Sequence, residues 1–377
     1  MRFLLLFLCS LLILSPQLPA QDPQVRVHFK TDRNAELTNT GRILTRAEDG
    51  GLLFQSPDSR LWTITPQQLI AEQPVPEKFQ FWTVEEQTNK LSDEFGPAFT
   101  INSREPYLFC SDADPKFLDS VARVMLRLDT AFTKFWSDRQ FPLHAPEHPL
   151  VVLIFKQRAD YERYATREFG PEIAQAPGYF SMIQNRIVFH DITAGLKFTP
   201  QTTMEDRLEK SGRQVSTIVH EATHQLAFNT GLQTRLADNP LWLTEGLAMY
   251  FETPDLKNRT GWTTAGKINP VRLQTYLKSI AQTPQLSLQE FVSSDAPFRN
   301  PKQEGAAYAR AWALTYYLLT KHPDKFTTYL QTISSKKPLI WNTPAERLHD
   351  FESAFGPAPQ LQPALEKFYT RKRQSPE

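Results

Sequence analysis

Cysteine is nearly absent from this chain, with 2 residues in 377. Cys9 lies in an N-terminal apolar run, and Cys110 would be alone once that run is removed. An internal disulfide and a thiolate zinc cluster are therefore excluded, and stability must come from burial of an apolar core. Cys110 itself, in the segment YLFCS, is predicted to be a buried strand residue.

The chain also lacks an excess of either charge. Lys and Arg number 42, Asp and Glu number 41, and the formal net charge is +1. Nothing in this balance favours binding to nucleic acid or to an anionic membrane surface, so we expect no nucleic-acid partner. The 40% hydrophobic and 22% charged composition is typical of globular proteins, long enough here for one large domain or two smaller ones.

Long apolar runs are missing too, apart from one at the start of the chain. Arg2 precedes an apolar stretch over residues 3–14, and Ser15-Pro16 breaks it. This pattern predicts a secretory signal peptide over residues 1–20, cleaved near Ala20, and the run is too short to span a bilayer comfortably. An uncleaved N-terminal anchor is the alternative. We therefore predict a secreted or periplasmic protein, with no stable membrane insertion after cleavage.

Two segments follow the predicted signal peptide. Residues 21–72 contain the short apolar stretches VRVHF, RILT, GLLFQ and LWTITP, separated by turn signals, and predict a small β-rich module. Its role is left open between a prodomain, a binding module and a packing cap. Residues 73–104 are rich in Pro, Gln, Glu and Thr, and predict a connector.

Residues 105–377 predict one larger α+β domain. Strands are expected at 107–111 and 150–155, a hairpin at 178–183 and 186–191, and a loop at 194–212. Apolar spacing of three to four residues predicts the following helices: 115–137, 158–169, 270–281, 287–293, 304–320, 323–333, 344–355 and 361–373. The sequence gives no indication of the oligomeric state.

One motif in the sequence contains candidate metal-binding and catalytic residues. His220-Glu221-Ala222-Thr223-His224 is an H-E-x-x-H sequence inside a predicted helix at 213–229. Histidines four residues apart lie on one face of a helix, so both can bind one Zn²⁺. The intervening Glu221 can act on a metal-bound water.

A second predicted helix supplies a third ligand. Pro240 suits its first position, Asp238 or Asn239 could cap it, and Pro254 ends it. Glu245 lies inside this helix, 21 positions after His224. Two histidines and one carboxylate would leave a fourth position open, as catalytic zinc requires.

The residues WLTEGLA at 242–248, together with the H-E-x-x-H motif, resemble the gluzincin branch of the zincin metallopeptidases. Membrane alanyl aminopeptidases carry a similar W-L-x-E-G-x-A, but the spacer here is longer. The chain looks more like the secreted peptidase-MA-like proteins, closely over 213–253 and more loosely over 105–335. The resemblance implies a zincin-like domain with a mixed sheet, a metal helix and a helical C-terminal half.

The resemblance also implies a reaction, the zinc-dependent hydrolysis of peptide or protein substrates. His220, His224 and Glu245 would bind Zn²⁺, and Glu221 would be the general base. In that family an edge strand, here 178–183 or 186–191, holds extended peptide. The expected amine anchor of aminopeptidases is absent from the sequence, which favours endopeptidase action.

The sequence leaves alternative interpretations open for several residues and for the function of the whole protein. Tyr308 is the candidate oxyanion donor, but it could instead form a packed helix face with Trp312 and Tyr316. Glu252 is a candidate for orienting a histidine ligand. His190-Asp191 could bind metal, although a polar strand end is the simpler interpretation. The whole protein could also be a metal-binding zincin scaffold with little turnover, or a hydrolase of non-peptide amides.

Overall fold

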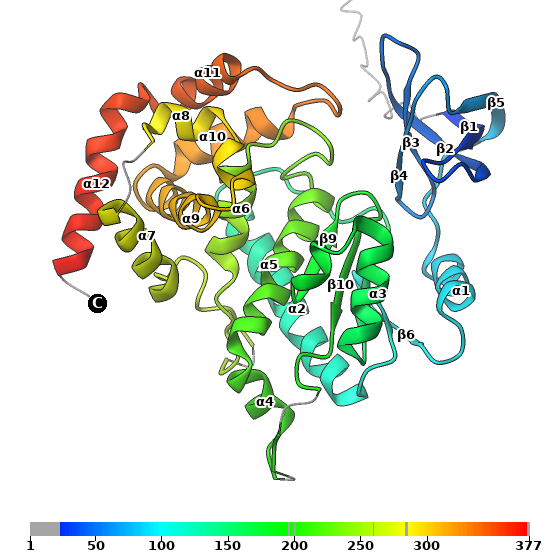
Figure 1. Ribbon diagram of the computed structural model, residues 1–377, viewed down its shortest axis with the longest axis horizontal. Coiled ribbons are helices and arrows are strands. Elements are labelled where there is room, and N and C mark those ends of the chain that lie inside the picture. Colours follow the sequence, from blue (N-terminus) through cyan, green and yellow to red (C-terminus); the bar gives the residue numbers. More distant parts are fainter. Residues whose placement is uncertain (1–22, 195–196, 200, 259, 283–285, 375–377) are drawn as a thin grey trace, which may run out of the picture.

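The computed structural model describes residues 23–374, apart from 195–196, 200, 259 and 283–285, and shows an α+β protein. A small β-sheet module, a mixed sheet covered by helices and a helical C-terminal half follow one another along the chain (Figure 1). The predicted signal peptide lies outside the described residues. Within them, no helix combines the length and the hydrophobicity needed to cross a bilayer.

The N-terminal module is an antiparallel sheet with the strand order β4-β3-β2-β1-β5. Val27 and Phe29 of β1 and Phe54 of β3 are buried in its own small core. The four predicted apolar stretches all form strands, and a fifth strand extends the sheet beyond residue 72. The strands are β1 (Pro23–Lys30), β2 (Glu36–Arg46), β3 (Leu52–Gln55), β4 (Leu61–Ile64) and β5 (Leu69–Lys78).

The segment 73–104, predicted as a connector, contains regular structure. After the end of β5 it forms helix α1 (Val84–Phe95) and strand β6 (Thr100–Arg104). Strand β6 pairs with β7 in the second sheet, and Arg186 of β10 donates two hydrogen bonds of 2.9 Å to Glu94 of α1. This part of the chain is therefore built into the second sheet and its covering layer.

The second sheet is mixed, with the order β6-β7-β8-β10-β9. Strands β7, β8 and β10 run parallel, and β6 and β9 are antiparallel at the two edges. All of β8 is buried, as its uninterrupted apolar sequence predicted. The strands after β6 are β7 (Tyr107–Ser111), β8 (Leu150–Phe155), β9 (Gly178–Ser181) and β10 (Arg186–His190).

Alternation along these strands divides the core into two layers. Val152 and Ile154 face the helices α2 (Pro115–Ser137) and α5 (Gly212–Asn229). Val151 and Leu153 face α1, α3 (Arg158–Phe169) and the short helix η1 (Ile173–Gln175). Successive side chains of a strand point to opposite faces, so a continuous apolar run suits a strand covered on both sides. Cys110 is fully buried in the second layer, as predicted.

The predicted loop 194–212 is only partly a loop, because helix α4 (Met204–Lys210) lies inside it. Thr203 caps this helix, and Asp206 bonds back to the Thr203 N–H. Such reciprocal capping stabilises a short polar helix that has little apolar periodicity to reveal it.

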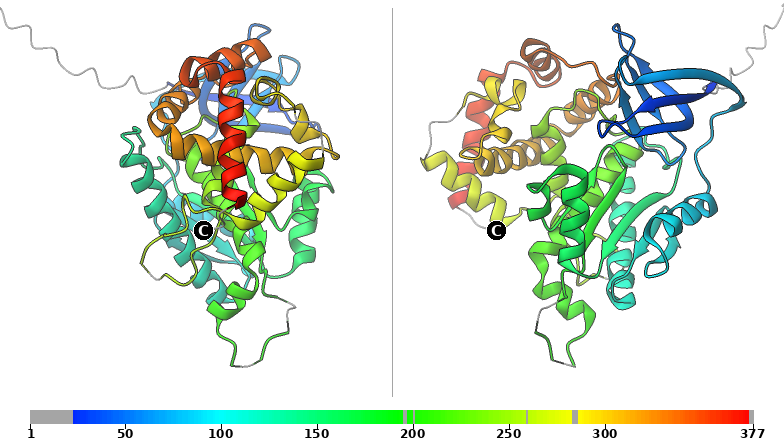
Figure 2. Two further views of the ribbon diagram at one scale, coloured as in Figure 1. Left: turned by 90° about the vertical axis from the view of Figure 1, so that its left-hand side faces the viewer. Right: turned by 45° about the vertical axis from the view of Figure 1, so that its right-hand side comes forward.

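The C-terminal half is helical and packs beside the mixed sheet (Figures 1 and 2). Its buried centre is α9, which packs along α6 and carries twelve buried residues. The predicted helices of this half are all present. They are α6 (Leu241–Phe251), α7 (Pro270–Gln282), α8 (Leu288–Ser293), the short helix η2 (Ala296–Arg299), α9 (Glu304–Lys321), α10 (Pro323–Ser334), α11 (Pro344–Phe355) and α12 (Ala358–Gln374).

Candidate metal centre and cleft

Helix α5 presents the two histidines of the motif on one face. Ile218, Val219 and Leu226 are buried against the sheet and fix the rotation of the helix. The helix ends before Gly231, whose φ of +84° is the left-handed conformation that favours glycine after a helix. The predicted helix at 213–229 is therefore confirmed.

Helix α6 brings Glu245 to the same place. Its sequence is almost entirely apolar, and nine of its eleven residues are buried. Gly246 allows close packing on α9, because a Cβ there would lie 2.1 Å from Thr315 Oγ1 and 2.8 Å from the Ala311 carbonyl oxygen. The neighbouring Glu245 is thus fixed by a closely packed pair of helices.

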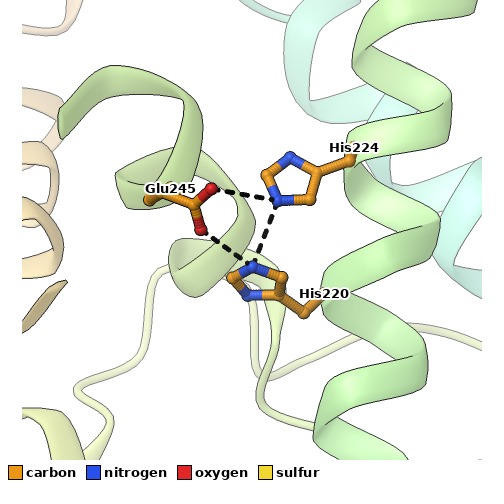
Figure 3. A group of neighbouring side chains, drawn as sticks. All are labelled: His220, His224 and Glu245. Atoms are coloured by element: carbon orange, nitrogen blue, oxygen red, sulfur yellow. Dashed lines mark hydrogen bonds and ion pairs between the residues drawn. The ribbon is translucent and has the colours of Figure 1, made fainter. Parts of the chain in front are cut away.

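The three side chains converge (Figure 3). His220 Nε2 lies 3.1 Å from His224 Nε2 and 3.1 Å from a carboxylate oxygen of Glu245. The other Glu245 oxygen lies 3.7 Å from His224 Nε2. Among the described residues, this is the one group of three His, Cys, Asp or Glu side chains close enough together to hold a metal ion.

A second carboxylate supports the first histidine from behind. His220 Nδ1 lies 3.3 Å from Glu252, which follows the last turn of α6. Arg272 of α7 donates to both oxygens of Glu252, at 2.7 and 2.8 Å, and Asn269 donates at 3.0 Å. With Nδ1–H directed at Glu252, His220 Nε2 has its lone pair free for a cation. The expected orienting role of Glu252 thus has the geometry it needs.

The electrostatics favour positive charge at this point. Burial would lower the pKa of His220, but the hydrogen bonds to Glu245 and Glu252 outweigh it and raise the pKa to about 10. Burial would raise the pKa of Glu245, but the two histidines hold it well below its usual range. A bound cation would satisfy the same carboxylate in place of protons on the histidines.

Glu221 lies beside the ligands and contacts the sheet. Its carboxylate accepts a 2.8 Å hydrogen bond from the backbone N–H of Phe180 in β9. Burial raises the pKa of Glu221, whereas the positive charges of His220 and His224 act to lower it. Because β9 is the outermost strand next to α5, its Phe180 N–H is directed at the motif and not into the sheet.

A cleft of about 1060 Å³ opens over these residues. Of the two hairpin strands expected to line it, β9 does, whereas β10 lies inside the sheet. Tyr308, at the start of α9, also lines the cleft, and burial with the nearby carboxylates of Glu245 and Glu304 raises its pKa. Its hydroxyl therefore stays protonated and can donate a hydrogen bond into the cleft.

The predicted start of α6 is wrong in two respects, and the first is that Pro240 is the N-cap and not the first helical residue. Neither Asp238 nor Asn239 caps α6, because the helix begins after Pro240 and the Leu241 N–H donates instead to Asp295, at 3.0 Å. Asp238 is fully buried and accepts hydrogen bonds from Arg347. This long-range pairing outcompetes the local cap.

The pair His190-Asp191 stays outside the metal centre. His190 Nδ1 lies 3.2 Å from the Asp191 carbonyl oxygen, and the Asp191 carboxylate accepts hydrogen bonds from Thr193. The polar strand-end interpretation is therefore the correct one. Phe180, Arg272 and Asn269 were not predicted, since each reaches the site only through tertiary contacts.

Residues 214–340 match the model of a protein family described as "Protein of unknown function (DUF1570)". The match runs from the first turn of α5 through α10 and includes all five candidate site residues. No curated protein matches the chain. The part of the chain that contains the candidate metal centre is thus similar to a family whose description assigns no activity.

Proposed function

We propose that the protein is a zinc-dependent peptidase that hydrolyses peptide bonds in peptide or protein substrates. The supporting observation is the convergence of His220 Nε2, His224 Nε2 and the Glu245 carboxylate beside Glu221, at the floor of a cleft with an edge strand. Residues 1–20, outside the described part, have the features of a secretory signal, so we place the reaction outside the cytoplasm.

The donor set fits zinc. Two imidazole nitrogens and one carboxylate are the ligands of many catalytic zinc sites, which keep a further position open. Donors about 2.0–2.1 Å from a tetrahedral ion lie roughly 3.3 Å apart, and the separations here are 3.1 to 3.7 Å. Bound Zn²⁺ would lower the pKa of water and polarise the scissile carbonyl.

The residues of the chain would carry the proton transfers and hold the substrate. Glu221 takes a proton from the attacking water and later passes it to the leaving amine. Tyr308 donates a hydrogen bond to the oxygen that becomes negatively charged. An extended peptide pairs with the backbone groups on the outer side of β9 that Glu221 does not occupy, where the strand lines the cleft.

The substitution Glu221→Gln tests this proposal, because it keeps the shape of the side chain and removes the base. We expect the variant to retain its metal while kcat/KM on a cleaved peptide falls by about 10²–10⁴-fold. Glu304→Gln is the matched control, since Glu304 lines the same cleft but is exposed. Zinc content should be measured in parallel for both variants.

The other interpretations make different predictions. A fully metallated Glu221→Gln protein within about tenfold of wild type would refute the proposed mechanism. A wild-type protein that binds metal but cleaves nothing in a peptide library would favour a binding scaffold or a hydrolase of non-peptide amides. Chelator treatment should abolish any peptide cleavage that depends on the centre.

A further inference from the structure

The N-terminal module rests directly on the hairpin that lines the cleft. The Leu61 N–H of β4 donates a 2.8 Å hydrogen bond to the carbonyl of Ile183, in the turn between β9 and β10. Asn185 in the same turn donates through its side chain to Ser59 Oγ, at 3.1 Å. In the right-hand view of Figure 2 the blue module lies at the end of the green sheet. The turn between β3 and β4 is thus seated on the end of the edge strand.

One buried arginine joins this contact to the metal helices. Arg235 lies in the connection between α5 and α6, and its side chain is 9% exposed. Its Nη1 donates to the Met182 carbonyl at 3.0 Å, and its Nη2 donates to the Ser59 carbonyl at 2.8 Å. A single guanidinium therefore links the module, the end of β9 and the segment that connects the two ligand-bearing helices.

Burying the charge of Arg235 costs folding free energy, so a gain in stability does not explain why an arginine occupies this position. Burial lowers the pKa of Arg235 to about 9, although the negative charge of Asp58 acts in the opposite direction. A buried ionic group is often replaced by an apolar one without loss of stability. The planar fork of arginine, however, can hold two carbonyl groups in one fixed geometry.

Strand β9 connects Arg235 to the H-E-x-x-H motif. Met182 follows Phe180 by two residues, and the Phe180 N–H donates to Glu221. We infer that Arg235 is a positioning residue, which uses the N-terminal module to hold β9 against Glu221. The module is then a permanent support of β9 and not a removable prodomain. The catalytic consequence rests on the proposed peptidase function, whereas the positioning of β9 does not.

Hydrogen exchange measured by mass spectrometry tests the inference on the full-length exported protein. In Arg235→Met we expect peptides covering residues 178–183 to exchange at least about tenfold faster, because two charge-assisted bonds are lost. Arg235→Lys should give an intermediate rate, since it keeps the charge but not the fork. Where peptidase activity is present, kcat/KM should fall about tenfold in Arg235→Met at unchanged zinc content.

Arg310→Met is the matched control. Arg310 is 7% exposed and its Nη1 donates to a carbonyl, that of Leu286, but it does not contact β9. We expect the rate of hydrogen exchange in β9 to be the same in Arg310→Met as in the wild type. Equal exchange in Arg235→Met and wild type, or an equal rise in Arg310→Met, would overturn the inference.

Two further measurements keep the test independent of folding and of activity. If Arg235→Met does not fold, Ser59→Gly removes only the Asn185 contact, at a φ of +65° that glycine tolerates, and should speed β9 exchange by about fivefold. Unchanged exchange in that variant would count against the inference. An active enzyme that begins after residue 104 would also contradict it. Faster β9 exchange without any peptidase activity would leave the inference standing and remove the proposed function.

Discussion

Helix α6 carries two charge clusters of opposite character, one just before its first residue and one around Glu245 within it. Before its first residue, Asp238 accepts hydrogen bonds from Arg347 and lies 3.4 Å from Lys336. Arg347 also pairs with Asp295 at 3.0 Å, and Asp295 accepts from the first N–H of the helix. In this N-terminal cluster each acid faces a cation or a backbone donor, so the group is closed.

The cluster around Glu245 is open by comparison. Two imidazole nitrogens and a carboxylate point at one another with 3.1 Å between the nitrogens, and all three line the cleft. Neutral imidazoles with their Nε2 lone pairs turned to one point repel each other unless a proton or a metal ion lies between them. The difference lies in the balance of charge: the closed cluster contains its own counter-charges, whereas the candidate metal centre leaves a charge to be supplied from outside.

Breaking the closed cluster should cost stability and leave the centre's metal binding intact. Asp238→Ala removes the acid that Arg347 and Lys336 share and leaves them only Asp295 and Asp350, and we expect a loss of about 3 kcal/mol in the free energy of unfolding. Unfolding in denaturant measures this change in the free energy of unfolding. The matched control is Asp119→Ala, which removes an exposed pair with Arg104 and should cost less than about 1 kcal/mol. Equal losses in the two variants would contradict the structural role of the N-terminal cluster.

Changing Tyr308 should affect turnover and not stability. Tyr308→Phe removes one hydrogen-bond donor from the cleft, and we expect kcat/KM to fall by about 10²–10³-fold. Tyr316→Phe is the control, because Tyr316 lies on the same helix and packs on Trp312. If Tyr308→Phe behaves like this control, Tyr308 belongs to the packed helix face and the oxyanion donor lies elsewhere.

Weakening the support of His220 should affect the metal directly. Glu252→Gln keeps the size of the side chain but removes the charge next to Nδ1, and we expect zinc affinity to fall by about 10–100-fold. Competition with a chromogenic chelator measures the affinity. Glu304→Gln again controls for the general charge of the cleft, and an equal loss in that variant would argue against a specific role of Glu252.

The two helices that carry the candidate metal ligands were predictable because their signals are local. The spacing of His220 and His224, the apolar face of α5 and the Gly231 stop all lie within twenty residues. Helix α6 and Glu245 followed from an apolar run in the same way, although Pro240 is the N-cap and not the first helical residue as predicted. Each of these features depends on backbone geometry within one element, which the sequence encodes directly.

The missed features divide into two kinds. Helices α1 and α4 carried a usable signal, the capping boxes beginning at Thr83 and Thr203, which polar composition obscured. Asp295, 54 residues after Leu241, and Arg235 on the Ser59 carbonyl had no local signal at all. Their roles depend on which distant segments the fold brings together, and hydrophobic periodicity does not report that.

The zinc content of the purified protein tests the central claim most directly. Elemental analysis of the wild type should give one Zn²⁺ per chain, and His220→Ala and His224→Ala should each lose it, because each removes one of three converging donors. Wild-type protein without stoichiometric zinc after zinc loading, or full stoichiometry retained in both variants, would contradict the assignment of His220, His224 and Glu245 as a metal centre.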